Sequence, residues 1–322
     1  MGLTHPSPDG TIDVAIIGAG YMAREHVRAF VSIPGVRVCG IHSRTAARAE
    51  SLSAEFGIQT VAASIPNLYE RTRAQLVVIA VPELEVRAVA EACFEFSWVA
   101  LVEKPAGYNY EDAQAIANAA SLAQRRAFVA LNRRYYSSTR HVRAALASDT
   151  SPRFIKVQDQ EDPAQALASG QPSLVVANWM YANSIHLIDL FRVFGRGAVA
   201  SVNPVIPWNA DVPGVVVSHV RFDSGDEGLY EGLWNAPGPW AVSVSTPATR
   251  WELRPIEQVS RQNRGERRAV AIDVDARDVD YKAGLWAQAE AAVAAVRHEP
   301  TDLPTLKDAL ETMRLARMIF GV

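Results

Sequence analysis

Lys104 is the residue whose position most clearly suggests chemistry. It follows the apolar run in WVALVEKPAG, and residues 98–104 are predicted to form a strand buried on both faces. If that strand belongs to a parallel sheet, Lys104 lies at the carboxyl edge, where such sheets bind ligands. Glu103 would orient or pair with the lysine, and Pro105 would fix the backbone, with a cis bond as one option. A surface turn with an incidental ion pair is the alternative.

A glycine-rich turn near the start predicts a nucleotide site. GAGYMA, residues 18–23, has the pattern Gly-x-Gly-x-x-Ala directly after an apolar strand and directly before a helix. Gly18 would make the tight turn, Gly20 would let a pyrophosphate approach the backbone, and the small third residue would allow close helix packing. The helix start adds N–H groups and a positive dipole end for the phosphates.

The second strand, 36–42, should end beside the adenosine ribose of that nucleotide. An acidic residue there would bind the 2′-hydroxyl of NAD, but this chain has Ser43 followed by Arg44. A hydroxyl and a guanidinium suit a 2′-phosphate, so the sequence favours NADP, with NAD possible. Alternatively, Arg44 is an ordinary surface residue.

His186, in NSIHLIDL, is a candidate general acid or base. Imidazole titrates near neutral pH, which is what proton transfer coupled to hydride transfer at a carbinol requires. Asn183 precedes it by three positions, so both would share one face of a predicted helix over 178–194. A core or interface histidine is the other interpretation.

The elements that must position these residues change in type along the chain. Up to residue 131, apolar strands alternate with amphipathic helices, which predicts a doubly wound parallel sheet. Strands then follow one another with short turns, which predicts mostly antiparallel pairing, and two helices close the chain. The expected domains are a disordered lead at 1–10, a dinucleotide-binding domain at 11–131 and an α/β domain at 132–322.

Composition narrows the class of protein. With 322 residues, 49% of them hydrophobic and a net charge of −3, the chain suits a two-domain globular protein. That charge does not suggest nucleic acid or a membrane surface as a partner, and no apolar run is long enough to span a bilayer. No secretory signal is expected, and Cys39 and Cys93 are expected to be reduced core residues of a cytoplasmic protein. No spacing suggests a metal site.

Four motifs together resemble one family. VAIIGAGYMAREHVRAF, EKPAG, LNRRYYSS and NSIHLIDLFRVFG occur in this order and at separations similar to those of the Gfo/Idh/MocA (glucose–fructose oxidoreductase / inositol dehydrogenase) oxidoreductases. The resemblance covers nearly the whole chain. It implies a Rossmann domain followed by an α/β domain with a large, mostly antiparallel sheet. It also implies hydride transfer between NAD(P) and a sugar, a free or nucleotide-linked sugar derivative, or a cyclitol. Homodimers or homotetramers would form through the second sheet.

The resemblance also implies residue roles. Lys104 would contact the substrate oxygen and His186 would be the general acid/base. Asn132 would approach the substrate or nicotinamide, and Asn183 and Tyr181 would contact the substrate. Further cofactor contacts are expected from residues at the glycine turn and at two strand ends: Tyr21, Met22, Pro82, Glu103 and Lys104 itself.

Two positions depart from the family pattern. Ala182 stands four residues before His186, where many members have Asp, and Val86 stands where relatives often have His. An uncharged neighbour stabilises an imidazolium less well. Two alternatives therefore remain open: a non-catalytic NADP-binding sensor, and a reductase of an imine or unsaturated substrate.

Overall fold

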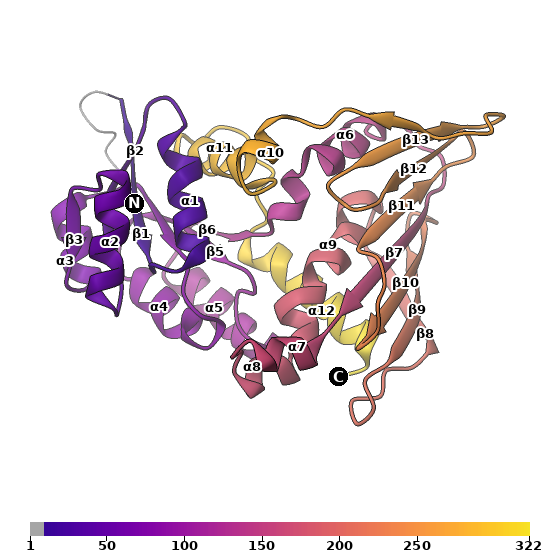
Figure 1. Ribbon diagram of the computed structural model, residues 1–322, viewed down its shortest axis with the longest axis horizontal. Helices are drawn as coiled ribbons and strands as arrows, with labels where there is room; N and C mark the ends of the chain where they lie inside the picture. Colours follow the sequence, from indigo (N-terminus) through magenta and orange to yellow (C-terminus); the bar gives the residue numbers. More distant parts are fainter. Residues whose placement is uncertain (1–9) are drawn as a thin grey trace. The chain divides into compact units, whose positions relative to one another are not determined.

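The computed structural model describes residues 10–322, which form two compact units. The first contains the chain as far as Asn132 together with Asp280–Leu310, and the second contains Arg133–Val279 with Glu311–Val322. Figure 1 labels the elements of both. Apart from Gly10, the expected disordered lead lies outside the described residues.

The first unit is built on a six-stranded parallel sheet with the order β3-β2-β1-β4-β5-β6. Its strands are β1 (Ile12–Ile17), β2 (Val36–His42), β3 (Thr60–Ala62), β4 (Leu76–Ile79), β5 (Val99–Glu103) and β6 (Ala127–Ala130). Every residue of β1, β4, β5 and β6 is buried, which explains why these strands are apolar apart from Asp13 and Glu103. The predicted doubly wound sheet is confirmed, and its strand order reverses between β1 and β4.

Helices connect these strands. They are α1 (Tyr21–Val31), α2 (Ala46–Phe56), α3 (Ile65–Thr72), η1 (Glu83–Glu85), α4 (Val86–Cys93) and α5 (Tyr110–Leu122). Asn109 caps α5, because its side chain accepts the N–H of Asp112 at 2.8 Å. Gly57 ends α2 in the left-handed conformation, as expected for a C-terminal glycine. The short β3 and α3 were not predicted.

Residues 280–310 return to the first unit, although the expected second domain ran unbroken from 132 to 322. Helix α11 (Leu285–Val296) packs against α1, β4 and β5. The indole N–H of Trp286 donates to the Ser32 hydroxyl at 3.0 Å, and the N–H of Val129 donates to the carbonyl of Pro304 at 2.8 Å. This return involves contacts between distant residues, which a reading in chain order does not reveal.

The second unit contains an eight-stranded sheet with the order β14-β13-β12-β11-β7-β10-β9-β8. Its strands are β7 (Phe154–Glu161), β8 (Val199–Ile206), β9 (Val215–Phe222), β10 (Glu227–Trp234), β11 (Ala241–Ser245), β12 (Thr249–Leu253), β13 (Val259–Asn263) and β14 (Val270–Ile272). Neighbours are antiparallel except β7 and β10, which are parallel, so the mostly antiparallel prediction is confirmed. Association of copies through this sheet stays a prediction.

Helices α6 and α9 pack on this sheet, against β12 and against β7 and β11 respectively. The helices of this part of the chain are η2 (Asn132–Tyr135), α6 (Ser137–Ala145), α7 (Pro163–Ala168), α8 (Ser173–Ala177), η3 (Met180–Ser184), α9 (Ile185–Phe194), α10 (Arg277–Asp280) and α12 (Leu306–Phe320). The predicted helix over 178–194 is interrupted, because η3 is a π-helical turn before α9. Such turns are frequent at functional sites.

Both cysteines are free thiols. Burial raises the pKa of Cys39 to about 12 and raises the pKa of the fully buried Cys93 as well. Neither thiol is therefore activated as a nucleophile. Among the described residues, no helix is long and apolar enough to cross a membrane, and no group of three or more potential metal ligands occurs.

A buried ion pair anchors α9. Asp189 accepts two hydrogen bonds from the Arg134 guanidinium, at 2.5 and 2.6 Å, and one from the Thr312 hydroxyl at 2.7 Å. The Asp189 side chain is 2% exposed. Removing one partner of such a pair leaves an uncompensated buried charge.

We expect Asp189→Ala to lower the free energy of unfolding by about 3–5 kcal/mol. Urea denaturation monitored by circular dichroism measures this loss. Glu91→Ala is the matched control, because it removes the exposed Arg87–Glu91 pair and should cost about 0.5 kcal/mol or less. Equal losses in the two variants would contradict the assigned role of Asp189.

Candidate functional site

The glycine turn has the geometry that a dinucleotide pyrophosphate requires. Gly18 has a φ of +110°, and a Cβ atom there would collide with the carbonyl oxygen of Ala80. Gly20 precedes α1, and a Cβ atom there would meet nothing within 4 Å. The first turn of α1 contains no acidic residue that would repel a phosphate. The turn therefore fits the cofactor by shape and by charge.

At the end of β2, the two predicted ribose-side residues have partners of their own. The Ser43 hydroxyl accepts the N–H of Thr45 at 3.3 Å. The Arg44 side chain is 80% exposed, and its Nη1 lies 2.8 Å from Oε1 of Glu85. An exposed pair of this kind is weak, so Arg44 is free to exchange Glu85 for another anion.

Three further predicted cofactor residues lie in the first unit. Tyr21 opens α1 and is 64% exposed, with the Lys282 ammonium 5.5 Å from its ring centre. Met22 is half-buried in the same turn, and Pro82 precedes η1 at the end of β4. All three follow strands that end at the carboxyl edge of the parallel sheet.

The end of β5 is held by a buried hydrogen bond. Oε1 of Glu103 lies 2.6 Å from Nε2 of His26 on α1, and the two side chains are 7% and 1% exposed. Oε2 of Glu103 accepts the backbone N–H of Lys104 at 3.1 Å. The Lys104–Pro105 bond is cis. Glu103 therefore fixes the backbone from which the half-buried Lys104 side chain leaves.

Sequence reasoning missed His26. It lies on the buried face of α1 with Ala23, Val27 and Phe30, at helical spacing. A histidine within an otherwise apolar stripe was the available signal.

Asn132, predicted to approach the substrate or nicotinamide, is 3% exposed. Its side-chain N–H donates to the carbonyl oxygen of Ala283 at 3.0 Å, which ties the end of β6 to the returning segment 280–310. Asn132 therefore makes a structural hydrogen bond, and its contact with substrate or nicotinamide stays a prediction.

In the second unit, His186 is 3% exposed and contacts an arginine. Nη1 of Arg133 lies 2.8 Å from Nε2 of His186. Because arginine stays protonated and only donates, Nε2 accepts this hydrogen bond, and the imidazole is neutral with its proton on Nδ1. The Arg133 guanidinium also lies 5.0 Å from the ring centre of Trp240, and the His186 ring lies 6.4 Å from it.

The two predicted substrate residues before His186 lie in η3. Tyr181 is buried, as is the neighbouring Ala182. The side-chain N–H of Asn183 donates to Oε2 of Glu161 at 2.8 Å. The Trp179 indole N–H donates to the same oxygen at 2.6 Å. Glu161 therefore organises this turn.

Glu161 and Asp159 form a buried carboxyl pair on β7. Each is 1% exposed, and Asp159 accepts the Tyr230 hydroxyl at 2.6 Å. Burial raises the pKa of Asp159, and burial together with the charge of Asp159 raises the pKa of Glu161 well above its usual range. Burial and the same aspartate also raise the pKa of Tyr230, which stays a donor.

One oxygen of each carboxyl, Oδ1 of Asp159 and Oε1 of Glu161, is buried without a donor from the described residues. The two carboxyls interact with each other. The Ser184 hydroxyl also faces Asp159. Because two ionised carboxylates only accept, we infer that the pair retains one shared proton.

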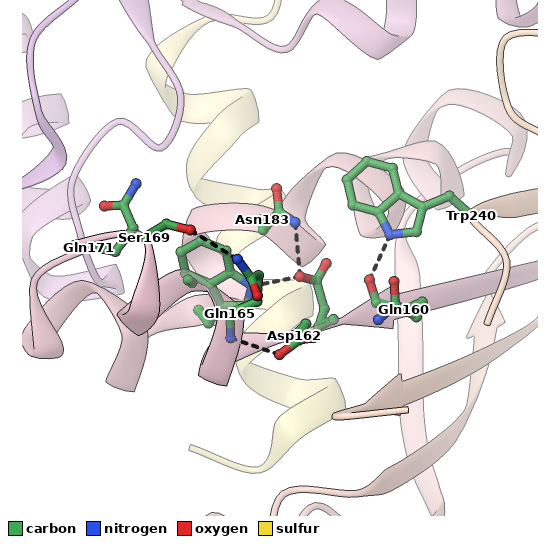
Figure 2. Close-up of a pocket in the computed structure, with 10 residues that line it drawn as sticks. Gln160, Asp162, Gln165, Ser169, Gln171, Asn183 and Trp240 are labelled. Atoms are coloured by element: carbon green, nitrogen blue, oxygen red, sulfur yellow. Dashed lines mark hydrogen bonds between the residues drawn. The ribbon is translucent and has the colours of Figure 1, made fainter. Parts of the chain in front are cut away.

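Glu161 also borders a pocket of about 400 Å³ that lies wholly in the second unit. Figure 2 shows Asn183 from η3 and Trp240 on its border, with the Trp240 indole N–H directed at the carbonyl of Gln160, a 2.8 Å hydrogen bond. The lining comprises three glutamines, one asparagine, one serine, one alanine, two carboxyl residues and two tryptophans. The pocket is therefore rich in hydrogen-bonding groups and aromatic surface.

The predicted site residues thus fall into two groups. One surrounds the carboxyl edge of the first unit's sheet, and the other surrounds η3 and the pocket. The residues that sequence reasoning missed in the second group are Arg133, Asp159 and Glu161. Arg133 belongs to the motif LNRRYYSS, which was the available signal for it. In the strand FIKVQDQE, alternate residues are buried, and the two carboxyl residues lie on the same face as the buried Ile155 and Val157.

Comparison with known proteins supports the fold and the cofactor domain. Residues 12–131 match the model of the Gfo/Idh/MocA family, described as an oxidoreductase family with an NAD-binding Rossmann fold. A levoglucosan dehydrogenase, solved in complex with NADH and levoglucosan, has a TM-score of 0.79 at 17% identity, and the match covers 97% of this chain and 96% of that one. At that identity the likeness concerns the fold.

Two curated relatives are dehydrogenases. Inositol 2-dehydrogenase 1 of Saccharopolyspora erythraea is 26% identical over 66% of this chain. 4-Carboxy-2-hydroxymuconate-6-semialdehyde dehydrogenase of Sphingobium sp. (strain SYK-6) is 23% identical over 60% of it. The matches span 59% and 61% of the relatives' own lengths. The predicted resemblance is confirmed: residues 12–131 of this chain match the NAD-binding Rossmann domain that the Gfo/Idh/MocA family model describes.

Proposed function

We propose that this protein is an NAD(P)-dependent dehydrogenase or reductase that interconverts a hydroxyl and a ketone on a sugar, a sugar derivative or a cyclitol. The observation that carries the proposal is the backbone of Lys104, fixed at the carboxyl edge of a parallel sheet whose glycine turn fits a pyrophosphate. Similarity to inositol 2-dehydrogenase 1 and to a levoglucosan dehydrogenase supports the substrate class.

Each residue has a role that its chemistry allows. NAD(P), when bound, accepts or donates the hydride. Gly18, Gly20 and the start of α1 hold its phosphates. The Lys104 ammonium stabilises negative charge that develops on the substrate oxygen. His186 exchanges the hydroxyl proton, and for Nε2 to accept a proton the Arg133 hydrogen bond has to open.

A non-catalytic NADP-binding sensor is the second candidate. Two observations favour it: Ala182 replaces the acid expected beside His186, and Nε2 of His186 already accepts a hydrogen bond from Arg133. Reduction of NADP+ or NAD+ by any polyol, or oxidation of NADPH or NADH by any keto-sugar, removes this candidate, whereas tight cofactor binding without turnover across both compound classes supports it.

We expect Lys104→Ala to lower kcat by about 100- to 1,000-fold, because it removes one charge-stabilising group from the transition state. The affinity for cofactor should stay within about twofold, since the phosphates contact the glycine turn instead. Steady-state kinetics and a fluorescence titration with cofactor measure the two effects. Lys307→Ala, which removes an exposed lysine of α12, is the matched control. Equal losses of turnover and cofactor affinity would refute the assigned role.

For the cofactor, we propose a preference for NADP that depends on Arg44. Arg44→Ala should weaken NADPH binding by about tenfold or more, because a charge-assisted contact to the 2′-phosphate is lost, and leave NADH binding unchanged. Parallel fluorescence titrations of wild type and variant with NADPH and NADH measure this. Glu85→Gln is the matched control: it removes the anion that pairs with Arg44, so NADPH affinity should be maintained or increased. Tighter NADH than NADPH binding by the wild type would disprove the preference.

A further inference from the structure

We propose that the pocket of the second unit binds an uncharged polyhydroxyl ring and discriminates against phosphate-bearing ligands, with Glu161 as its positioning residue. The inference rests on the proposed function and adds the charge class of the substrate and the residues that select it. No phosphate-bearing or nucleotide-linked sugar is expected to place its phosphate in this pocket.

The size and lining of the pocket support a ring-shaped polar ligand. Its volume of about 400 Å³ lies within the range of small-molecule sites. Neutral amides of Gln160, Gln165, Gln171 and Asn183 offer both donors and acceptors, which suits hydroxyl groups because each hydroxyl also donates and accepts. Indole rings provide apolar surface for the C–H face of such a ring.

The charge of the pocket argues against an anionic ligand. Of the described residues that line it, none is lysine, arginine or histidine, whereas Glu161 and Asp162 are acidic. Phosphate sites in proteins are instead built from arginine, lysine or several backbone N–H groups. The Arg133 guanidinium lies against Trp240 and donates to His186, and it is not part of the lining.

Glu161 determines the shape of the pocket. Both Trp179 and Asn183 donate to its Oε2, at 2.6 and 2.8 Å, so one carboxyl group orients an aromatic and an amide residue of the border. Its other oxygen is buried beside Asp159, where the shared proton satisfies it. A carboxyl held this tightly acts on a ligand by positioning Trp179 and Asn183.

The shared proton has a measurable consequence for stability. A carboxyl whose pKa is raised by folding contributes stability that is complete below its ordinary pKa of about 4 and is lost as the pH rises through the raised value. Tyr230, whose pKa is also raised, is the titratable group that faces the pair from β10, and its hydroxyl stays protonated over this range. The carboxyl pair, through its shared proton, is therefore the group that titrates in this range.

We accordingly expect the free energy of unfolding of Glu161→Gln to fall less between pH 5 and about 9 than that of the wild type, because the amide N–H replaces the shared proton at every pH. Urea denaturation across this range measures the difference. Identical pH profiles would show that no shared proton is present.

The main test is isothermal titration calorimetry of the full chain, saturated with NADPH, with matched ligands. The uncharged probes are glucose and myo-inositol, and the charged probes are glucose 6-phosphate and UDP-glucose. Uncharged probes should bind at least tenfold more tightly than charged ones. Trp179→Ala and Glu161→Ala should each weaken that binding at least tenfold, and Glu161→Gln should restore most of what Glu161→Ala loses.

Trp208→Phe is the matched control, because Trp208 packs against Trp234 and Phe320 of the same unit and lies outside the lining. It should bind the uncharged probes like the wild type. Preferred binding of the charged probes, no saturable binding of either uncharged probe, or equal weakening by Trp208→Phe and Trp179→Ala would each overturn the inference.

The outcomes also separate this inference from the proposed function. All pocket variants should keep wild-type NADPH affinity, which is measured before sugar is added. Turnover of glucose 6-phosphate or UDP-glucose but of no uncharged sugar would uphold the dehydrogenase and overturn the inference. Binding of uncharged sugars that Trp179→Ala abolishes, with no turnover, would uphold the inference and overturn the dehydrogenase.

Discussion

The buried hydrogen bond between Glu103 and His26 connects the two motifs of the first unit. One partner ends β5 directly before Lys104, and the other lies on the helix that begins at Gly20. The bond therefore ties the element that would bind a phosphate to the element that would present an ammonium. It also explains why an apolar strand ends in a glutamate: burial of that carboxyl is compensated by the imidazole and by the backbone N–H of Lys104.

In the second unit, buried carboxyl groups are stabilised in a different way. Its carboxyl pair, Asp159 and Glu161, is more buried than Glu103, and no cation of the described chain is among its hydrogen-bond partners. Neutral donors from Tyr230, Trp179 and Asn183 compensate it instead. Desolvation and mutual repulsion then favour retention of one proton by the pair. A rigid, weakly charged border suits recognition of hydroxyl groups, for which geometry matters more than net charge.

Sequence patterns predicted the structural features that depend on residues close together in the chain. Largely apolar strands and the glycine turn are local signals, and each was read correctly. The three-residue β3 is too short to produce a periodic pattern. The return of α11 to the first unit and the Asn132–Ala283 hydrogen bond depend on contacts between distant residues, which no local pattern encodes. The carboxyls of β7 were readable as polar residues at buried positions, but the strand also carries polar residues on its other face, so the pattern did not single them out.

The environment of His186 connects these observations. In the pattern implied by the family resemblance, an aspartate before the histidine would stabilise an imidazolium. Here the uncharged Ala182 occupies that position, and a guanidinium donates to Nε2, which favours the neutral ring. A neutral imidazole is the form that accepts a proton from a substrate hydroxyl, as oxidation of an alcohol requires, whereas reduction of a ketone requires a group that already carries the proton to be donated. If His186 is the proton partner, Arg133 keeps its ring in the neutral form, and the Arg133 hydrogen bond has to open before Nε2 can accept the substrate proton.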